Sequence, residues 1–266
     1  MNIQEMMNAA QPPVVYSREG KDCYYDPYRQ KFAEATPEEI VMDKNTYSLL
    51  ENYMLACMKD SAHDKDHIYR VLYNALDIAK TESHVNGDVL IAACLLHDIG
   101  RSTQAKDPKI SHAQAGAKMA YDFLIEHNFE KEFALHVESC IMTHSYRKKN
   151  PPQTPEAKIL FDADKLDVTG AIGIARTLMY KGDACEPMYS LRSDGTVSDG
   201  TEDQEPSFFQ EYKFKLENIY SRFYTQRARD IARQRQETAA WFYNKLYNEV
   251  TASYENGQKI LEEKLL

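Results

Sequence analysis

The sequence predicts an all-α protein, a helical bundle with an additional pair of C-terminal helices, and three observations lead to this fold class. Glycine and proline number only 10 each among 266 residues, below their usual shares of ~7% and ~5%, which favours helices joined by short loops. Apolar residues recur with helical spacing, as at Ile68, Val71, Leu72 and Ala75. No segment alternates between apolar and polar residues for long enough to predict a sheet.

Charge and cysteine usage exclude several classes of protein. Lysine and arginine number 32 against 41 aspartates and glutamates, a net charge of −9, which argues against a surface built to bind nucleic acid or anionic lipid. The five cysteines are widely spaced and form no CxxC pair, so neither a zinc ribbon nor a disulfide framework is indicated. No apolar run approaches the ~18 residues of a membrane span, and no signal peptide is visible. We therefore expect a soluble, cytoplasmic protein.

The first part of the chain is expected to be an irregular arm up to about residue 35. A helix then begins at Thr36, because the segment Thr36-Pro37-Glu38-Glu39 combines a threonine cap, a proline at the first helical position and a glutamate at the third. The segment 89–96 is apolar on every side, which predicts a central, buried helix that ends at Gly100.

The spacing of apolar residues predicts the remaining helices. They are expected over residues 46–59, 67–81, 112–126, 131–144 and 155–180. The last of these could break near Gly170 or Gly173. Two amphipathic helices follow, over residues 206–223 and 228–250.

These expectations divide the chain into three parts. Residues 1–44 are an N-terminal arm of unknown role, residues 45–184 form the core, and residues 185–266 contribute helices packed on that core. An acidic loop at residues 193–205 opens the last part, and its aspartate spacing does not match the loop of a calcium-binding EF-hand.

The strongest chemical feature is the pair His97-Asp98 at the end of the wholly apolar segment. A buried imidazole or carboxylate costs several kcal/mol unless it is paired or bound to a metal ion. A His-Asp dipeptide is common, however, and a pair satisfied by hydrogen bonds would explain it as well as a metal site does.

A histidine opens the preceding helix at His67, and Asp164 lies well downstream, so that a histidine, a His-Asp pair and an aspartate follow one another on successive helices. This order resembles the HD phosphohydrolase superfamily, in particular a bacterial subgroup of predicted HD hydrolases. The resemblance covers residues ~45 to ~250. Its most specific stretches are residues 62–71 (AHDKDHIYRV), 95–100 (LLHDIG), 143–145 (THS), 162–167 (DADKLD) and 170–176 (GAIGIAR).

The resemblance implies that His67, His97, Asp98 and Asp164 bind one divalent ion. Two imidazoles and two carboxylates suit manganese, iron, nickel, cobalt or zinc, whereas magnesium prefers oxygen ligands and water. Asp164 stands in the family's Ala-Asp position. Asp167 lies one turn further on and is expected to orient a metal ligand or to contact the substrate.

Two further histidines raise the question of a second ion. His112 and His144 resemble positions that bind a second metal in binuclear HD proteins. They could instead contact phosphate, donate a proton or cap helices. His63 precedes His67 by one helical turn and could also face the site.

The expected chemistry is hydrolysis of a phosphate ester or anhydride by metal-activated water. Asp98 could orient or deprotonate that water, and His112 or His144 could protonate the leaving oxygen. Lys165 is a further catalytic candidate, because it stands beside Asp164 and could neutralise a phosphate.

Other cations are candidates for binding the substrate. Arg101 follows the His-Asp pair, Arg176 lies about three turns beyond Asp164 if the helix continues, and Arg229 and Arg233 share a face of the basic C-terminal helix. For each of them a solvated surface position is the competing interpretation.

We therefore expect a cytoplasmic metal-dependent phosphohydrolase that acts on a small phosphorylated metabolite, with a nucleotide as the first candidate. A di-iron oxygenase of HD type is one alternative, and a non-catalytic module that senses a nucleotide is another. No membrane partner is expected and a nucleic acid is disfavoured by the acidic charge. A homodimer remains open.

Overall fold

A computed structural model describes residues 15–18, 21–26, 31–34, 42–58, 65–145 and 150–265. The chain divides into two compact units, residues 1–43 and residues 44–266. Residues 45–184 and 185–266, which the sequence distinguishes, both lie within the second unit.

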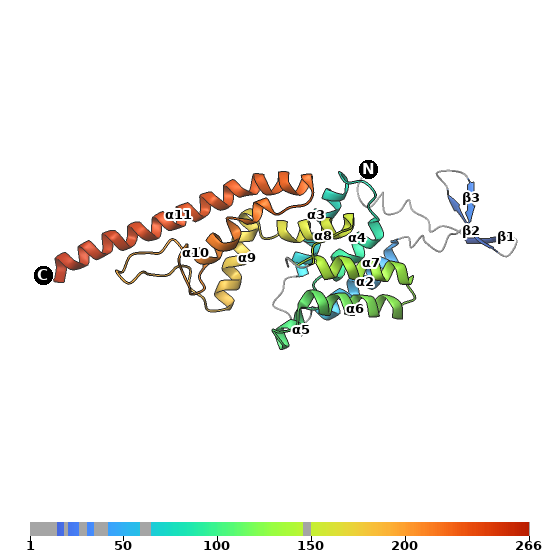
Figure 1. Ribbon diagram of the computed structural model, residues 1–266, viewed down its shortest axis with the longest axis horizontal. Coiled ribbons are helices and arrows are strands. Elements are labelled where there is room, and N and C mark those ends of the chain that lie inside the picture. Colours follow the sequence, from blue (N-terminus) through green and yellow to red (C-terminus); the bar gives the residue numbers. More distant parts are fainter. Residues whose placement is uncertain are drawn as a thin grey trace. The chain divides into compact units, whose positions relative to one another are not determined.

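The first unit contains a three-stranded antiparallel sheet in the order β1-β2-β3 (Figure 1). Its strands are β1 (Val15–Arg18), β2 (Lys21–Asp26) and β3 (Lys31–Glu34). The expectation of an irregular arm without a sheet is wrong here, because strands of four to six residues are too short for alternation to stand out in the sequence. The helix start expected at Thr36 lies outside the described residues.

The second unit is built from helices, which confirms the all-α prediction for this part of the chain. They are α2 (Lys44–Cys57), α3 (Lys65–Ala79), α4 (Gly87–Leu96), α5 (Arg101–Lys106), α6 (His112–Glu126), α7 (Lys131–Thr143), α8 (Pro155–Leu166), α9 (Gly170–Asp183), α10 (Phe208–Glu211), the π-helical turn η1 (Tyr212–Leu216), the 3₁₀ turn η2 (Ile219–Ser221) and α11 (Gln226–Leu265). None of the described helices is long and apolar enough to cross a membrane.

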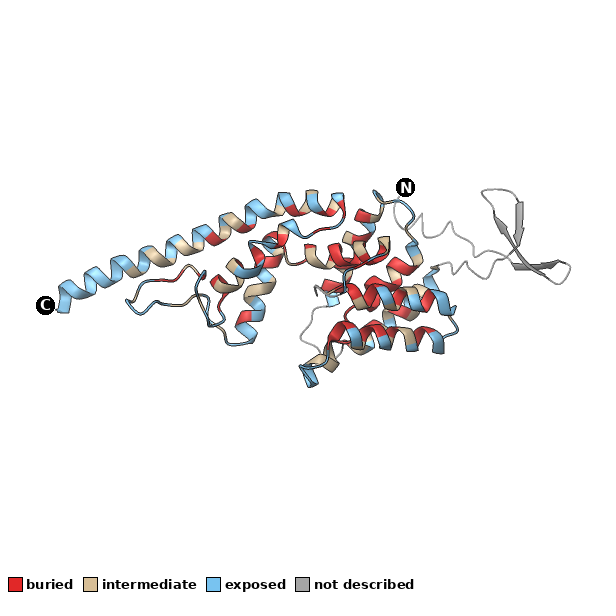
Figure 2. Cartoon of the chain, in the orientation of Figure 1, coloured by how far each residue is buried: buried red, intermediate tan, exposed pale blue. Residues whose placement is uncertain are grey.

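Helix α4 lies at the centre of the bundle, as predicted from its apolar sequence. It contacts α2, α3, α6, α7 and α8, and Figure 2 shows the buried residues gathered where these helices face one another. Asn86 caps its first turn by accepting hydrogen bonds from the backbone N–H groups of Asp88 and Val89. Because α4 ends at Leu96, the polar pair that follows it is placed at the edge of the apolar core.

The helix expected over residues 155–180 is divided into α8 and α9, with the break next to Gly170, one of the two positions predicted. Gly170 has a φ of +60°, a left-handed conformation that glycine adopts without strain. At the end of α8, the carbonyl oxygen of Leu166 accepts hydrogen bonds from the backbone N–H and the hydroxyl of Thr169 and, at 2.8 Å, from Arg235 of α11. The break leaves Asp164 and Lys165 in the last turn of α8 and Asp167 directly after it.

The segment 206–223 is not the single amphipathic helix that its pattern suggests. It is divided into α10, η1 and η2, and its aromatic residues pack in a cluster against α11, where the rings of Tyr212 and Tyr243 stack with centroids 4.0 Å apart. Helix α11 is longer than expected and continues to Leu265, with residues 255–265 exposed.

Asp162 ties the start of α11 to α8. Its carboxylate accepts hydrogen bonds from the backbone N–H groups of Tyr224 and Thr225 and from the hydroxyl of Thr225. A second link is the ion pair between Arg227 of α11 and Asp77 of α3, at 2.8 Å. These contacts hold α11 beside the end of α8, where the candidate site lies.

Candidate metal centre

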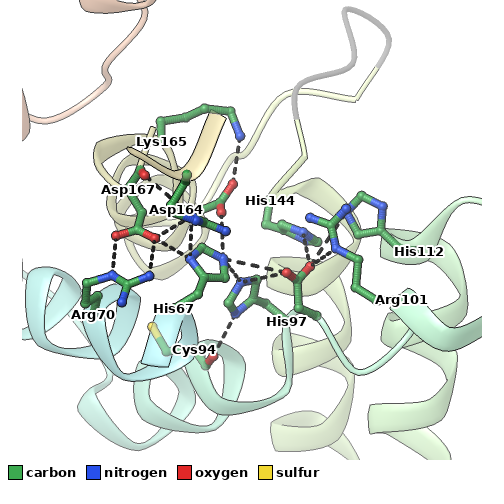
Figure 3. Close-up of polar contacts among 12 residues, drawn as sticks. His67, Arg70, Cys94, His97, Arg101, His112, His144, Asp164, Lys165 and Asp167 are labelled. Carbon is green, nitrogen blue, oxygen red and sulfur yellow. Dashed lines mark hydrogen bonds and ion pairs between the residues drawn. The ribbon is translucent and has the colours of Figure 1, made fainter. Parts of the chain in front are cut away.

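Polar side chains from the ends of five helices meet in one buried cluster (Figure 3). Each stands within the first or last turn of a helix or directly after one, so that its side chain reaches the edge of the apolar core while its backbone stays within the bundle. The members are His67 at the start of α3, His97 and Asp98 after α4, His112 at the start of α6, His144 after α7 and Asp164 in the last turn of α8.

The carboxylate of Asp98 lies between the histidines. Its Oδ2 is 3.6 Å from Nε2 of His67 and 3.7 Å from Nε2 of His97. Its Oδ1 is 3.8 Å from Nε2 of His112 and 3.6 Å from Nε2 of His144. Two groups that could hold a metal ion therefore share Asp98: one with His67 and His97, the other with His112 and His144. Asp164 adjoins the first group, with its Oδ1 3.4 Å from Nε2 of His67.

The hydrogen bonds at the far side of each ring determine which nitrogen faces the cluster. Nδ1 of His97 lies 2.8 Å from the carbonyl oxygen of Cys94, and Nδ1 of His144 lies 2.6 Å from that of Ile141. A carbonyl oxygen only accepts hydrogen bonds, so Nδ1 carries the proton in both rings. Nδ1 of His67 lies 2.7 Å from Oδ2 of Asp167, to which it donates, and 3.0 Å from Nη1 of Arg176. In each neutral ring Nε2 therefore presents a lone pair to the cluster.

The residues present fit a divalent cation. The Nε2 atoms of His67 and His97 lie 3.4 Å apart, so that two lone pairs face each other in the neutral rings. Asp98 Oδ2, His112 Nε2 and His144 Nε2 are buried and have no hydrogen-bond partner. Buried acceptors without partners are rare and costly, and one or two cations would satisfy all of them. A set of imidazole and carboxylate ligands suits the first-row transition metals.

Burial and charge set the protonation of the cluster. Burial lowers the pKa of His97 to about 4, and burial together with the charge of Arg101 lowers the pKa of His112 to about 3, so both rings are neutral at pH 7. Burial alone would raise the pKa of Asp98, but the neighbouring His97, His144 and Arg101 outweigh it and hold this pKa well below its usual value. His97, His112 and Asp98 thus offer the deprotonated groups that a metal ion requires. Burial alone would lower the pKa of His67, but its hydrogen bonds to Asp164 and Asp167 outweigh burial and raise this pKa.

Asp167 anchors His67 and is itself held by two arginines. Arg70 donates to its Oδ1 from Nε at 2.8 Å, and Arg176 of α9 donates to its Oδ2. Since these partners occupy the buried carboxylate, its position is that of a group that orients a ligand, one of the two roles expected for it. Arg70 was not singled out from the sequence, although it lies one helical turn after His67 and shares its face.

The other expected cations are placed differently. Arg101 donates from Nε to Oδ1 of Asp98 at 2.9 Å, and Lys165 donates to Oδ2 of Asp164 at 2.7 Å. Arg176 reaches the cluster from α9, not along a continuous helix with Asp164 as the sequence suggested. Arg229 and Arg233 make their hydrogen bonds and ion pairs within the described part of the chain away from the cluster.

The contacts of those two residues lie close to them in the sequence. Arg229 donates to the carbonyl oxygen of Phe223 at 2.9 Å, and Arg233, exposed to solvent, lies 4.0 Å from Asp230. A binding role for them stays a prediction. His63 lies outside the described residues. Gln104 of α5 escaped notice in the sequence; its Oε1 lies 2.9 Å from Nδ1 of His112 and orients that ring.

Comparison with known proteins identifies the domain that carries this cluster. Residues 65–169 match the HD domain, and they include every residue of the cluster. YpgQ of Bacillus subtilis is 28% identical over 198 residues, which cover 72% of this chain and 86% of YpgQ. A crystal structure of YpgQ in complex with ADP has a TM-score of 0.60 at 25% identity and covers 77% of this chain and 97% of that one.

Two solved structures that are described as HD-superfamily hydrolases are also similar. The one from Bacillus thuringiensis has a TM-score of 0.60 at 28% identity, over 79% of this chain and 98% of its own. The one from an uncultured Thermotogales bacterium has a TM-score of 0.51 at 28% identity, over 75% and 90%. The helical fold, the histidine and aspartate cluster and these similarities agree: residues 65–169 of this chain form an HD domain.

Proposed function

We propose that this protein is a metal-dependent phosphohydrolase that acts on a small phosphorylated metabolite, with a nucleotide as the preferred class. The observation that carries the proposal is the convergence of buried lone pairs on one point, with Asp98 Oδ2, His112 Nε2 and His144 Nε2 lacking any partner. The similarity to HD-superfamily hydrolases supports hydrolysis as the reaction class. The complex of the relative YpgQ with ADP supports a nucleotide as the ligand.

The proposed metal ligands are His67, His97, Asp98 and Asp164. A divalent ion at these residues would lower the pKa of a water molecule and offset the charge of phosphate oxygens. Asp98 Oδ2 has no hydrogen-bond partner, so this oxygen can accept a hydrogen bond from the attacking water and orient it. Asp167 keeps Nε2 of His67 turned towards the site through its bond to Nδ1.

The tautomers favour one of the roles expected for His112 and His144. A proton donor to the leaving oxygen must carry a proton on the nitrogen that faces the substrate. In His144 the proton sits on Nδ1 and is donated to the carbonyl oxygen of Ile141. His112 has a pKa near 3 because of its burial, and the bond from Nδ1 to Gln104 leaves Nε2 without a proton. We infer that both serve as ligands of a second ion in preference to acting as acids.

The cations at the edge of the cluster would bind the phosphate. Lys165 and Arg101 each neutralise a carboxylate of the site, with contacts of 2.7 Å to Asp164 and 2.9 Å to Asp98. Both are only partly buried, with side-chain exposures of 18% and 28%, so their remaining N–H groups can reach an incoming anion. Hydrogen bonds between charged donors and phosphate are about twice as strong as neutral ones.

The experiment is a hydrolysis screen over phosphomonoesters and nucleotides with manganese, nickel, cobalt and magnesium. We expect phosphate or pyrophosphate release that depends on a transition metal and stops when a chelator removes it. No release from any substrate with any of the metals would contradict the proposal. If metal-loaded protein then still bound nucleotides, the sensing module would become the better description.

A second candidate, the di-iron oxygenase, is favoured by one observation: the two possible metal groups share Asp98. Such a bridging carboxylate would suit two ions. Metal analysis of protein purified without added metal separates the candidates. Two irons per chain together with oxygen-dependent turnover would establish the oxygenase, and metal-dependent phosphate release without oxygen would exclude it.

A further inference from the structure

A cavity of about 180 Å³ lies directly beside the candidate metal centre. Its lining combines residues of α8 with residues of the segment that precedes α11, namely Phe161, Lys165, Lys215, Ile219 and Arg222. None of the metal ligands proposed above lines it. The cavity therefore needs an explanation separate from that of the cluster.

Lys165 connects the cavity to the metal centre. Its ammonium group lies 2.7 Å from Oδ2 of Asp164 and 5.0 Å from the centre of the Phe161 ring. Lys165 and Phe161 are one helical turn apart on α8, and both line the cavity. The side chain of Lys165 therefore forms part of the cavity wall and also contacts Asp164, a proposed metal ligand. A molecule held at the metal centre could extend past Lys165 into the cavity.

The lining indicates the chemistry of the ligand. Phe161 and Ile219 supply an aromatic and an aliphatic surface, whereas three residues carry positive charge, and no acidic residue among those the structure describes belongs to the lining. Lys215 is 54% exposed and pairs with Glu211 at 2.9 Å, and its other N–H groups stay accessible. An apolar surface surrounded by cations suits a flat or apolar organic group that bears a negative charge.

We propose that this cavity binds the part of the substrate that is not hydrolysed: an aromatic or apolar group with its own anionic substituent, recognised by Lys215 and Arg222 over the surface of Phe161 and Ile219. The proposal rests on the function proposed above and adds specificity to it. Lys165 would then contact the substrate between the reacting phosphate and this second anionic group.

The chain offers a matched pair of lysines for the test. Lys213 and Lys215 belong to the same turn, η1, and each is paired with a glutamate, at 3.0 Å to Glu217 and at 2.9 Å to Glu211. Only Lys215 lines the cavity, whereas the ammonium group of Lys213 lies over the ring of Tyr243. Alanine substitutions at the two positions change the net charge equally, so a difference between them reports on the cavity.

The experiment measures equilibrium binding of ADP, AMP and adenosine to the full chain by dialysis, with product formation checked in parallel. Lys215→Ala should weaken ADP binding by about tenfold, since it removes one charge-assisted hydrogen bond, and Arg222→Ala should act in the same direction. Lys213→Ala should leave ADP binding unchanged, and adenosine should respond least to Lys215→Ala because it has no anionic group.

Two outcomes would overturn the proposal: equal effects of Lys213→Ala and Lys215→Ala, or no effect of Lys215→Ala and Arg222→Ala. This failure is distinguishable from failure of the proposed function. Normal hydrolysis with unaltered ADP binding in Lys215→Ala refutes the cavity alone. ADP binding that depends on Lys215, without hydrolysis of any substrate, refutes the phosphohydrolase alone.

Discussion

At the scale of single residues, free carbonyl groups at two helix ends orient His97 and His144 towards the candidate metal site. The last carbonyl groups of a helix have no partner within it. His97 and His144 stand directly after α4 and α7, and each donates from Nδ1 to the carbonyl oxygen three residues earlier, of Cys94 and Ile141. The helix thereby satisfies one of its own carbonyl groups and turns the lone pair of Nε2 into the site. A histidine in the middle of a helix would find no such free carbonyl.

Asp98→Asn is the sharpest test of the centre. The substitution preserves the size of the side chain but removes the negative charge that lies between four histidine rings. We expect the variant to lose bound metal on dialysis and to lose turnover with it, as measured by elemental analysis and the hydrolysis screen. Asp107→Asn, on an exposed residue after α5, serves as the control. A metal-free Asp98→Asn protein with full activity would refute the assignment.

Asp167→Asn tests the positioning of His67. The carboxylate accepts from Nδ1 of His67 and from Arg70 and Arg176, and losing such a partner of a metal ligand typically lowers metal affinity by about 10–100-fold. Metal titration calorimetry should find this loss while the fold persists. Asp77 lies further along α3 and pairs with Arg227 of α11. Asp77→Asn weakens this ion pair and should leave metal affinity intact. Equal losses in both variants would indicate a general electrostatic effect.

At the scale of secondary structure, the sequence predicts the core helices well and the C-terminal segment poorly. The bounds of α6 coincide with the prediction, since one face of the helix is apolar and His112 and Glu126 mark its ends. The same kind of pattern in residues 206–223 belongs to three short elements. Periodicity indicates which side of a segment is buried. Tyr212, where α10 passes into η1, stacks on Tyr243 of α11, a partner that the local sequence does not reveal.

The close approach of two elements at Gly100 positions His112. A Cβ at residue 100 would overlap the backbone oxygen of His112 and come within 2.5 Å of the backbone nitrogen of Gly116. Gly100→Ala should therefore push α6 away from the end of α4, lower the free energy of unfolding by about 1–3 kcal/mol and reduce metal affinity. Urea denaturation and metal titration measure both effects.

Gly182→Ala is the matched control, because a Cβ at residue 182 of α9 would have no atom within 4 Å. Alanine also has a higher helix propensity than glycine, so this variant should be at least as stable as the wild type. An unchanged stability of Gly100→Ala would show that α4 and α6 can separate freely.

At the scale of the whole molecule, the site was predictable where it follows a sequence pattern. The order of His67, His97-Asp98 and Asp164 reveals the family resemblance, and the structure brings these residues together. Contacts between distant residues were not predictable: Arg70 meets Asp167 across 97 positions of sequence, and the cavity at Lys215 depends on how η1 folds back on α8. Likewise, the net charge of −9 gives no indication that Lys165, Lys215 and Arg222 line one cavity.

The division of the chain into two units predicts that chemistry resides in the second. The boundary lies at Asp43, directly before α2 begins, and all the proposed ligands lie in the HD domain. Removal of residues 1–43 should leave metal content unchanged and kcat/KM within about threefold, roughly 0.7 kcal/mol. Elemental analysis and the hydrolysis assay test both expectations.

The control for this truncation is a cut that also removes α2. Leu50 and Met54 of α2 are fully buried, and α2 packs against the central helix α4, so a chain that begins at residue 58 should lose cooperative unfolding, because a large apolar area is exposed. If the shorter truncation kept its metal and its helical circular dichroism but lost turnover, the N-terminal unit would have to contribute to the substrate site. Such a result would contradict a catalytic unit complete in residues 44–266.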